Sequence, residues 1–153
     1  MKIIVLGIGN LLLRDEGVGI HAVRQLQKRS LPRDVEIVDA GTASWYITPY
    51  LKDTEKLIVI DAVKNGGKPG AIYHLGFDGS AIQSLPPLDS ISLHQIDFFQ
   101  SLTWLKNGPK EIIIFGIEPK EINWGMELSK EVNEKISELI ELVWKELALE
   151  VKC

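Results

Sequence analysis

Residues 2–26 carry the sequence KIIVLGIGNLLLRDEGVGIHAVRQL, and this stretch decides the fold. Its first part, Lys2 to Gly7, is an apolar run rich in Ile and Val that does not alternate with polar residues. Such a run is typical of a β-strand that is covered on both faces. Apolar side chains then recur at helical spacing, at Val18, Ala22, Val23 and Leu26. The stretch therefore predicts a buried strand, a loop and an amphipathic helix.

Later segments repeat this alternation of strand and helix. Further strand-like apolar runs lie at Val35–Asp39, Leu57–Asp61, Ala71–Leu75 and Glu111–Gly116. Helical stripes lie at Ile96, Phe99 and Leu102 and, with nearly perfect period, from Leu128 to Leu147. Strands that alternate with helices predict a parallel sheet with right-handed crossovers. We therefore expect one α/β domain that spans residues 1–153.

The segment Val63–Gly70 departs from that alternation. It reads VKNGGKPG, which is turn chemistry with no room for a helix. The strand at Ala71–Leu75 is therefore expected to return antiparallel beside the strand that precedes it. Residues 76–92 are polar and contain Pro86 and Pro87, which predicts a long irregular connection.

Composition sets the broad class of the protein. With 153 residues, 45% of them hydrophobic and 25% charged, the chain matches an ordinary globular domain. Its net charge of −4 argues against a protein that binds nucleic acid by neutralising phosphates. No stretch approaches the roughly 20 apolar residues of a membrane span, and the single cysteine, Cys153, can form no internal disulfide. We expect a cytoplasmic protein without membrane or nucleic-acid partners, and nothing in the sequence demands more than a monomer.

Gly7 and Gly9 invite a dinucleotide-binding interpretation that the rest of the loop does not support. That fingerprint requires a third glycine three residues after the second, where this chain has Leu12. The helix also starts late, after the apolar residues 11–13. The two glycines are better explained by a sharp turn, or by close approach to a ligand or to neighbouring backbone.

Carboxylates stand at the predicted strand ends, where ligands bind in open α/β sheets. Asp39, Asp61 and Glu118 come at the ends of three strands, and Glu16 lies at the start of the first helix. Glu16 and Asp61 each have a structural alternative, because Glu16 would complement the helix dipole and Asp61 would serve as a turn or cap residue. The residues alone leave both interpretations open.

His94 is the most informative of the three histidines. The segment Ser92-Leu93-His94-Gln95 matches a capping box, which places His94 in the first turn of a helix. The positive end of a helix disfavours imidazolium, and a neutral imidazole is what a metal requires. Together, Glu16, Asp61 and His94 would suit a divalent first-row metal with open positions. An exposed first-turn histidine explains His94 equally well.

Gly7–Gly19 resembles the N-terminal signature of the nickel–iron hydrogenase maturation endopeptidases. Four more motifs of that family follow in order, at Asp39–Thr42, Val59–Ala62, Ser92–His94 and Gly116–Pro119. The resemblance thus covers nearly the whole chain. Two residues depart from the family pattern, since Ala40 replaces a usual glycine and Lys130 stands where the family often has proline.

The resemblance implies a fold and an activity. The fold is a three-layer α/β/α sandwich with a mixed, mostly parallel, twisted five-stranded sheet of the phosphorylase/hydrolase-like type. The activity is removal of a short C-terminal extension from the [NiFe] hydrogenase large-subunit precursor, with the inserted nickel as the recognition signal. By the same resemblance, Glu16, Asp61 and His94 would contact that nickel, which the substrate supplies. Asp39 would belong to the substrate-binding or catalytic cleft, so that Asp61, Glu16 and Asp39 form the expected catalytic set.

Two other classes of function stay open at this point. The sequence contains no Gly-x-Ser-x-Gly elbow and its only cysteine is terminal, which disfavours a covalent nucleophile. It also contains no His-Glu-x-x-His helix, the motif of a zinc protease. A metal-independent hydrolase of a small peptide or nucleoside would keep its activity in a chelator. A non-catalytic module that checks nickel loading would bind the precursor without cleaving it.

Overall fold

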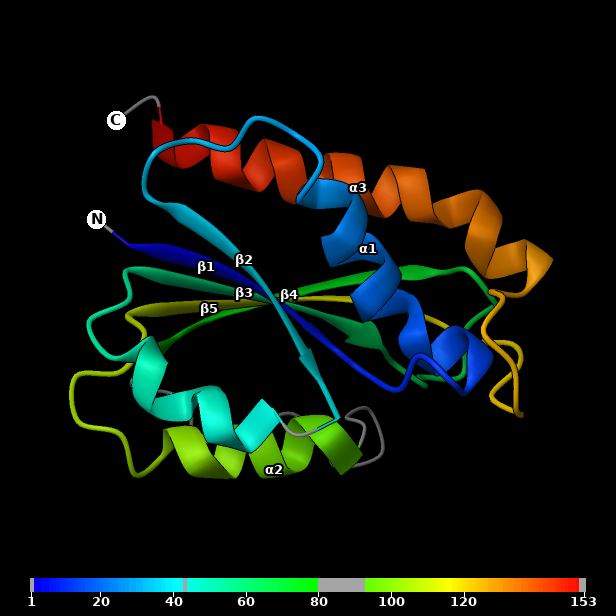
Figure 1. Cartoon of the computed structure of the whole chain (residues 1–153), viewed down its shortest axis with the longest axis horizontal. Helices are drawn as coiled ribbons and strands as arrows, with labels where there is room; N and C mark the ends of the chain where they lie inside the picture. Colours follow the sequence, from blue (N-terminus) through cyan, green and yellow to red (C-terminus); the bar gives the residue numbers. More distant parts are fainter. Residues whose placement is uncertain (1, 43, 80–92, 152–153) are drawn as a thin grey trace.

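The computed structural model describes residues 2–42, 44–79 and 93–151, and a five-stranded sheet runs through its centre (Figure 1). The strands are β1 (Ile3–Ile8), β2 (Val35–Gly41), β3 (Lys56–Ala62), β4 (Ile72–Asp78) and β5 (Glu111–Ile117). Their order across the sheet is β2-β1-β3-β5-β4. All neighbours are parallel except β4 and β5, so the sheet is mixed and mostly parallel, as predicted.

Helices cover both faces of the sheet and make three layers. The helices α1 (Val18–Leu26) and α3 (Lys130–Val151) lie on one face, and α2 (Leu93–Leu102) with the 3-10 segment η2 (Ser44–Leu51) lies on the other (Figure 1). A short 3-10 segment, η1 (Arg14–Gly17), joins the loop after β1 to α1. The α/β/α sandwich expected from the sequence is confirmed.

Alternate side chains of β1 face different layers. Ile3 and Val5 belong to the core under α1 and α3, whereas Ile4, Leu6 and Ile8 belong to the core under α2 and η2. All five side chains are buried. Burial of both faces explains why the strands are continuous apolar runs, and each fully buried Ile or Leu contributes roughly 1.5–3 kcal/mol to stability.

The helix α3 has 22 residues, and its apolar stripe packs on the sheet. The buried members of the stripe are Val132, Ile136, Leu139, Ile140, Val143 and Leu147. Ser129 caps the helix, since its hydroxyl accepts a hydrogen bond of 3.4 Å from the Val132 amide. In the described part of the chain, no helix is both long enough and apolar enough to cross a membrane.

The position of β4 differs from the sequence prediction. The strand is antiparallel, but it pairs over its whole length with β5 and not with β3. The reason lies in the side chains of the two strands. Residues 112–115 of β5 are all buried, which suits an interior strand, whereas residues 74–76 of β4 are exposed, which suits the edge of the sheet.

Gly7 and Gly19 allow α1 to pack closely on the sheet. A Cβ atom on Gly7 would lie 2.5 Å from the carbonyl oxygen of Gly19, and one on Gly19 would lie 2.2 Å from the carbonyl oxygen of Ile60. Neither position has room for a side chain in a close-packed interior. These two glycines of the signature thus serve helix–sheet packing, which fixes where the first turn of α1 meets the ends of β1 and β3.

Candidate active site at the strand ends

Gly9 stands where β1 turns into the loop that leads to η1. Its φ of +147° is a conformation that residues with a Cβ rarely adopt. A Cβ at this position would lie 2.0 Å from the carbonyl oxygen of Glu16 and 3.5 Å from Oδ1 of Asp61. Because Gly9 has no side chain, the backbone of Glu16 and the carboxylate of Asp61 can both approach it. The structure thus places the backbone of Glu16 and the carboxylate of Asp61, two of the three predicted metal-binding residues, against the same glycine.

Asp61 is the penultimate residue of β3 and is only 1% exposed. Strand alternation places it on the same face as Leu57 and Val59, which pack in the core under α2. The backbone amide of Ala62 donates a hydrogen bond of 2.7 Å to its Oδ1, which fixes the orientation of the carboxylate. Asp61 therefore presents an oriented carboxylate at a strand end, on the α2 side of the sheet.

His94 is the second residue of α2, as expected for a residue in the first turn of a helix. The helix begins on the side of the sheet where the parallel strands end (Figure 1). His94 and Asp61 thus belong to the same end and the same face of the sheet. The side chain of His94 and the predicted cap Ser92 lie outside the part of the structure that is described.

Asp15, next to Glu16 in η1, is a fully buried carboxylate with a structural role. Its Oδ2 accepts hydrogen bonds of 2.8 Å from the amides of Lys120 and Glu121, and its Oδ1 accepts one of 2.7 Å from the amide of Ser129. Burial alone would raise the pKa of Asp15, but these hydrogen bonds outweigh it and hold the pKa below its usual range. Asp15 therefore joins η1 to the loop that carries these three amides. In this way it positions Glu16, the next residue of η1.

Replacing Asp15 with asparagine should lower the free energy of unfolding by about 2–4 kcal/mol at neutral pH, since an amide side chain cannot accept all three hydrogen bonds. Because the folded-state pKa is depressed, this stabilisation is fully present above the ordinary carboxyl pKa of about 4 and is lost as the pH falls through the folded-state pKa. Urea denaturation at neutral and at acidic pH measures the free energy of unfolding of wild type and variant. The difference between the two free energies should become smaller in acid. Asp34→Asn, at an exposed position, is the control, and a difference that does not change with pH would contradict the prediction.

The structure separates Asp39 from Asp61. Asp39 lies on β2 beside Gly7 of β1, and its Oδ2 is 3.7 Å from Nη2 of Arg24 on α1. Its Oδ1 accepts a hydrogen bond of 3.1 Å from the amide of Gly41. Asp39 thus stands at the same rim of the sheet as Asp61, but its carboxylate faces α1 and not α2.

Glu118, the third strand-end carboxylate, stabilises the loop between β3 and β4. Its Oε1 accepts hydrogen bonds of 2.9 Å from the amides of Asn65 and Gly67 and one of 2.7 Å from the Tyr73 hydroxyl. Burial would raise the pKa of Glu118, but these hydrogen bonds lower it overall. These contacts give Glu118 a structural role in the loop.

Glu16 and Asp61 supply two carboxylates of the predicted metal-binding set. Among the residues that the structure describes, no group of three or more His, Cys, Asp and Glu side chains could hold a metal ion. The side chain of the predicted third donor, His94, is outside the described part of the structure. Carboxylate and imidazole donors together suit a first-row divalent metal, so the chemistry of these residues fits nickel and the three-residue set stays a prediction.

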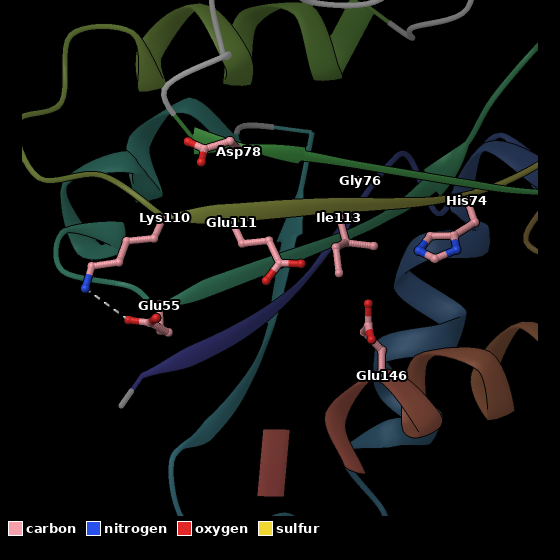
Figure 2. A pocket seen from close by; sticks show the side chains of 8 residues that line it. All are labelled: Glu55, His74, Gly76, Asp78, Lys110, Glu111, Ile113 and Glu146. Atoms are coloured by element: carbon pink, nitrogen blue, oxygen red, sulfur yellow. Dashed lines mark ion pairs between the residues drawn. The ribbon is translucent and has the colours of Figure 1, made fainter. Parts of the chain in front are cut away.

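A separate pocket lies toward the amino end of β5, away from Gly9 and Asp61 (Figure 2). It is lined by Glu55, His74, Gly76, Asp78, Lys110, Glu111, Ile113 and Glu146. Lys110 and Glu55 form an ion pair of 3.3 Å at one end of it. None of the described residues that line this pocket belongs to the candidate site at the strand ends.

Sequence reasoning missed the loop at residues 119–129, which completes the rim beside η1. The amide of Gly125 donates to the carbonyl oxygen of Leu12 at 2.9 Å, and the amide of Arg14 donates to the carbonyl oxygen of Gly125 at 2.8 Å. The only signal in the sequence was the charged pair Arg14-Asp15 directly before Glu16. The amides that Asp15 binds come 105, 106 and 114 residues later, which no local pattern reveals.

These features define the class of the protein: a three-layer α/β/α domain with a carboxylate site at the ends of its parallel strands. Fold alone does not settle function, but similarity to known proteins does so here. The family model described as Hydrogenase maturation protease (HycI) matches residues 20–146. The chain belongs to this family and is a hydrogenase maturation endopeptidase.

Individual relatives agree with that assignment. The hydrogenase expression/formation protein HupD of Bradyrhizobium diazoefficiens is 34% identical over 152 residues, which cover 96% of this chain and 78% of HupD. The hydrogenase 2 maturation protease of Escherichia coli is 33% identical over 150 residues, which cover 94% of this chain and 88% of the relative. The solved structure of the hydrogenase maturating endopeptidase HybD from E. coli matches with a TM-score of 0.86 and 30% identity, over 98% of this chain and 94% of HybD. The resemblance seen in the sequence motifs is therefore confirmed.

Proposed function

We propose that this enzyme removes the C-terminal extension of a [NiFe] hydrogenase large-subunit precursor after nickel has been inserted. Glu16, Asp61 and His94 recognise the nickel that the precursor carries. The observation that carries the proposal is the packing around Gly9, where the backbone of Glu16 and Oδ1 of Asp61 approach the same point. Carboxylate and imidazole donors carried by η1, by the end of β3 and by the first turn of α2 suit such a metal.

Hydrolysis of a peptide bond requires an activated water, a polarised carbonyl and a proton for the departing amine. Nickel brought by the precursor polarises the carbonyl or lowers the pKa of a bound water. Asp61 is buried and oriented by the Ala62 amide, so we assign to it the transfer of the proton from water to the leaving amine. Asp39, paired with Arg24 on the other face of the sheet, is assigned to binding the substrate at the rim.

An enzyme that contributes only part of a metal's ligands should hold free metal weakly. Glu16, Asp61 and His94 leave coordination positions for the ligands of the precursor. The enzyme therefore acts where nickel is delivered with the substrate, and an unloaded precursor is left uncut. We place this activity in the cytoplasm, with a monomer as the acting species and the precursor as its partner.

The test of this function compares nickel-loaded with nickel-free precursor, each incubated with purified enzyme. Mass spectrometry should detect the C-terminal fragment only from the nickel-loaded precursor. Chelator treatment of the enzyme alone, followed by removal of the chelator, should leave cleavage unchanged, because the nickel comes from the substrate. Cleavage of both precursors at the same rate would contradict nickel recognition, and binding without cleavage would contradict the protease activity toward this substrate.

A further inference from the structure

Four large apolar side chains are exposed on two loops that lie side by side at the rim. They are Leu12, Ile122, Trp124 and Met126, with exposed fractions of 50%, 39%, 78% and 55%. We call these four residues the rim patch. Single exposed apolar residues are normal on a protein surface, but several on adjoining loops mark an interaction site.

The backbone under the rim patch is firmly held. Gly125, between Trp124 and Met126, exchanges hydrogen bonds with Leu12 and Arg14, and Leu13 forms an isolated β-bridge with it. The carbon stem of Arg14 packs on Gly125, where a Cβ would lie 3.0 Å from Arg14 Cγ. A surface that is already ordered loses little conformational entropy when a partner binds, which favours a docking role.

The rim patch is continuous with the candidate active site. The carbonyl oxygen of Leu13 accepts a hydrogen bond of 3.1 Å from the amide of Glu16, and the carbonyl oxygen of Glu16 accepts one of 3.2 Å from the amide of Asn10. Leu12 therefore lies on the same short loop as Glu16. A protein that docks on this patch is held beside the loop that carries Glu16.

Four charged residues near the rim patch form two ion pairs. Nη1 of Arg14 lies 2.5 Å from Oε2 of Glu121, and Nζ of Lys120 lies 2.9 Å from Oε1 of Glu131. These pairs neutralise the charges of four residues beside the patch, and the exposed Glu127 next to Met126 adds one carboxylate. The partner that fits is therefore a mainly apolar protein surface.

We propose that the rim patch is the docking surface for the folded body of the large-subunit precursor, with Trp124 as its central anchor. The inference rests on the proposed function and adds the surface by which the substrate is held while its C-terminal segment enters the site. Trp is enriched among the residues that dominate binding energy at interfaces. The patch adjoins the hydrogen-bonded loop that carries Glu16, which favours the substrate of this site as the occupant over a second copy of the chain.

The test compares Trp124→Ser with Trp104→Ser. Trp104 is 85% exposed and follows the carboxyl end of α2, at the other end of the sheet from Gly9, so it is a matched control. Trp124→Ser should raise KM for nickel-loaded precursor about tenfold or more, with kcat within about twofold of wild type. Trp104→Ser should change neither constant, and Trp124→Phe should restore most of the affinity. Thermal melting confirms that the variants remain folded.

A direct binding measurement separates this inference from the proposed function. If wild type binds the precursor without cutting it and Trp124→Ser loses binding, the docking surface stands and the proteolytic role falls. If wild type cuts the precursor and both Trp124→Ser and Met126→Ser keep the wild-type KM, the docking surface is wrong. Sedimentation that shows a wild-type dimer abolished by Trp124→Ser would also overturn it, because the occupant would then be a second copy.

Discussion

Replacing Asp61 with asparagine should lower kcat/KM for nickel-loaded precursor on the order of 10²–10³-fold, the loss typical when one preorganised polar group is removed from an active site. Asparagine has the same shape, and its carbonyl oxygen can still accept the hydrogen bond that Oδ1 accepts from the Ala62 amide. The substitution therefore removes the charge and the proton-accepting ability of the carboxylate and leaves the local fold in place. Release of the C-terminal fragment, followed over time by mass, measures the effect.

The control for Asp61 is another aspartate at the end of a strand. Asp78 is the last residue of β4 and is exposed. In the sheet it lies opposite Glu111, the first residue of β5, away from the candidate site. Asp78→Asn should leave kcat/KM within about twofold of wild type, as most surface substitutions have small effects. Normal processing by Asp61→Asn, with its melting temperature unchanged, would remove Asp61 from the mechanism.

Gly9→Ala should lower the free energy of unfolding by about 3 kcal/mol or more and abolish cleavage. The added methyl group would meet the carbonyl oxygen of Glu16 at 2.0 Å, and the φ of +147° is strained for alanine. The chain can relieve the overlap only by moving η1 away from β1, which also moves Glu16 away from Asp61. Urea denaturation gives the loss of stability, and the precursor assay gives the loss of activity.

Gly66→Ala is the matched control for this substitution. Gly66 also has a positive φ, of +77°, but no atom lies within 4 Å of the position that its Cβ would take. Its replacement should cost only the left-handed backbone penalty of roughly 1–2 kcal/mol and should leave cleavage intact. Equal destabilisation by the two substitutions would show that contact with Glu16 contributes nothing at Gly9.

Much of the fold follows from the apolar pattern, because a strand buried on both faces must be a continuous apolar run. The ends of the five predicted strands agree with the structure to within about three residues. The neighbour of β4 could not be predicted in the same way. Chain order favours pairing with β3, whereas the exposed residues 74–76 require an edge position. That requirement becomes clear only once residues 112–117 of β5 are seen to be buried.

The candidate site was partly predictable for a related reason. Parallel strands end at one rim, so Glu16 and Asp61 could be expected near one another before their packing on Gly9 was known. The sequence predicts one catalytic set that contains both Asp39 and Asp61, because both lie at strand ends. The face to which such a side chain points depends on the register of the strand, and Asp39 pairs with Arg24 beneath α1. The partners of Asp15 and the rim patch depend on contacts between distant segments, which no local pattern contains.

The hydrogen bonds of Asp15 also bear on when this protein becomes competent during its synthesis. Its carboxylate oxygens accept hydrogen bonds from the amides of Lys120, Glu121 and Ser129. These contacts can form only after the ribosome has released about five-sixths of the chain. Until then the carboxylate of Asp15 lacks its three amide partners, and η1 lacks this anchor. A nascent chain that already contains β1, α1 and β3 therefore holds Glu16 and Asp61 before the contacts that position η1 have formed.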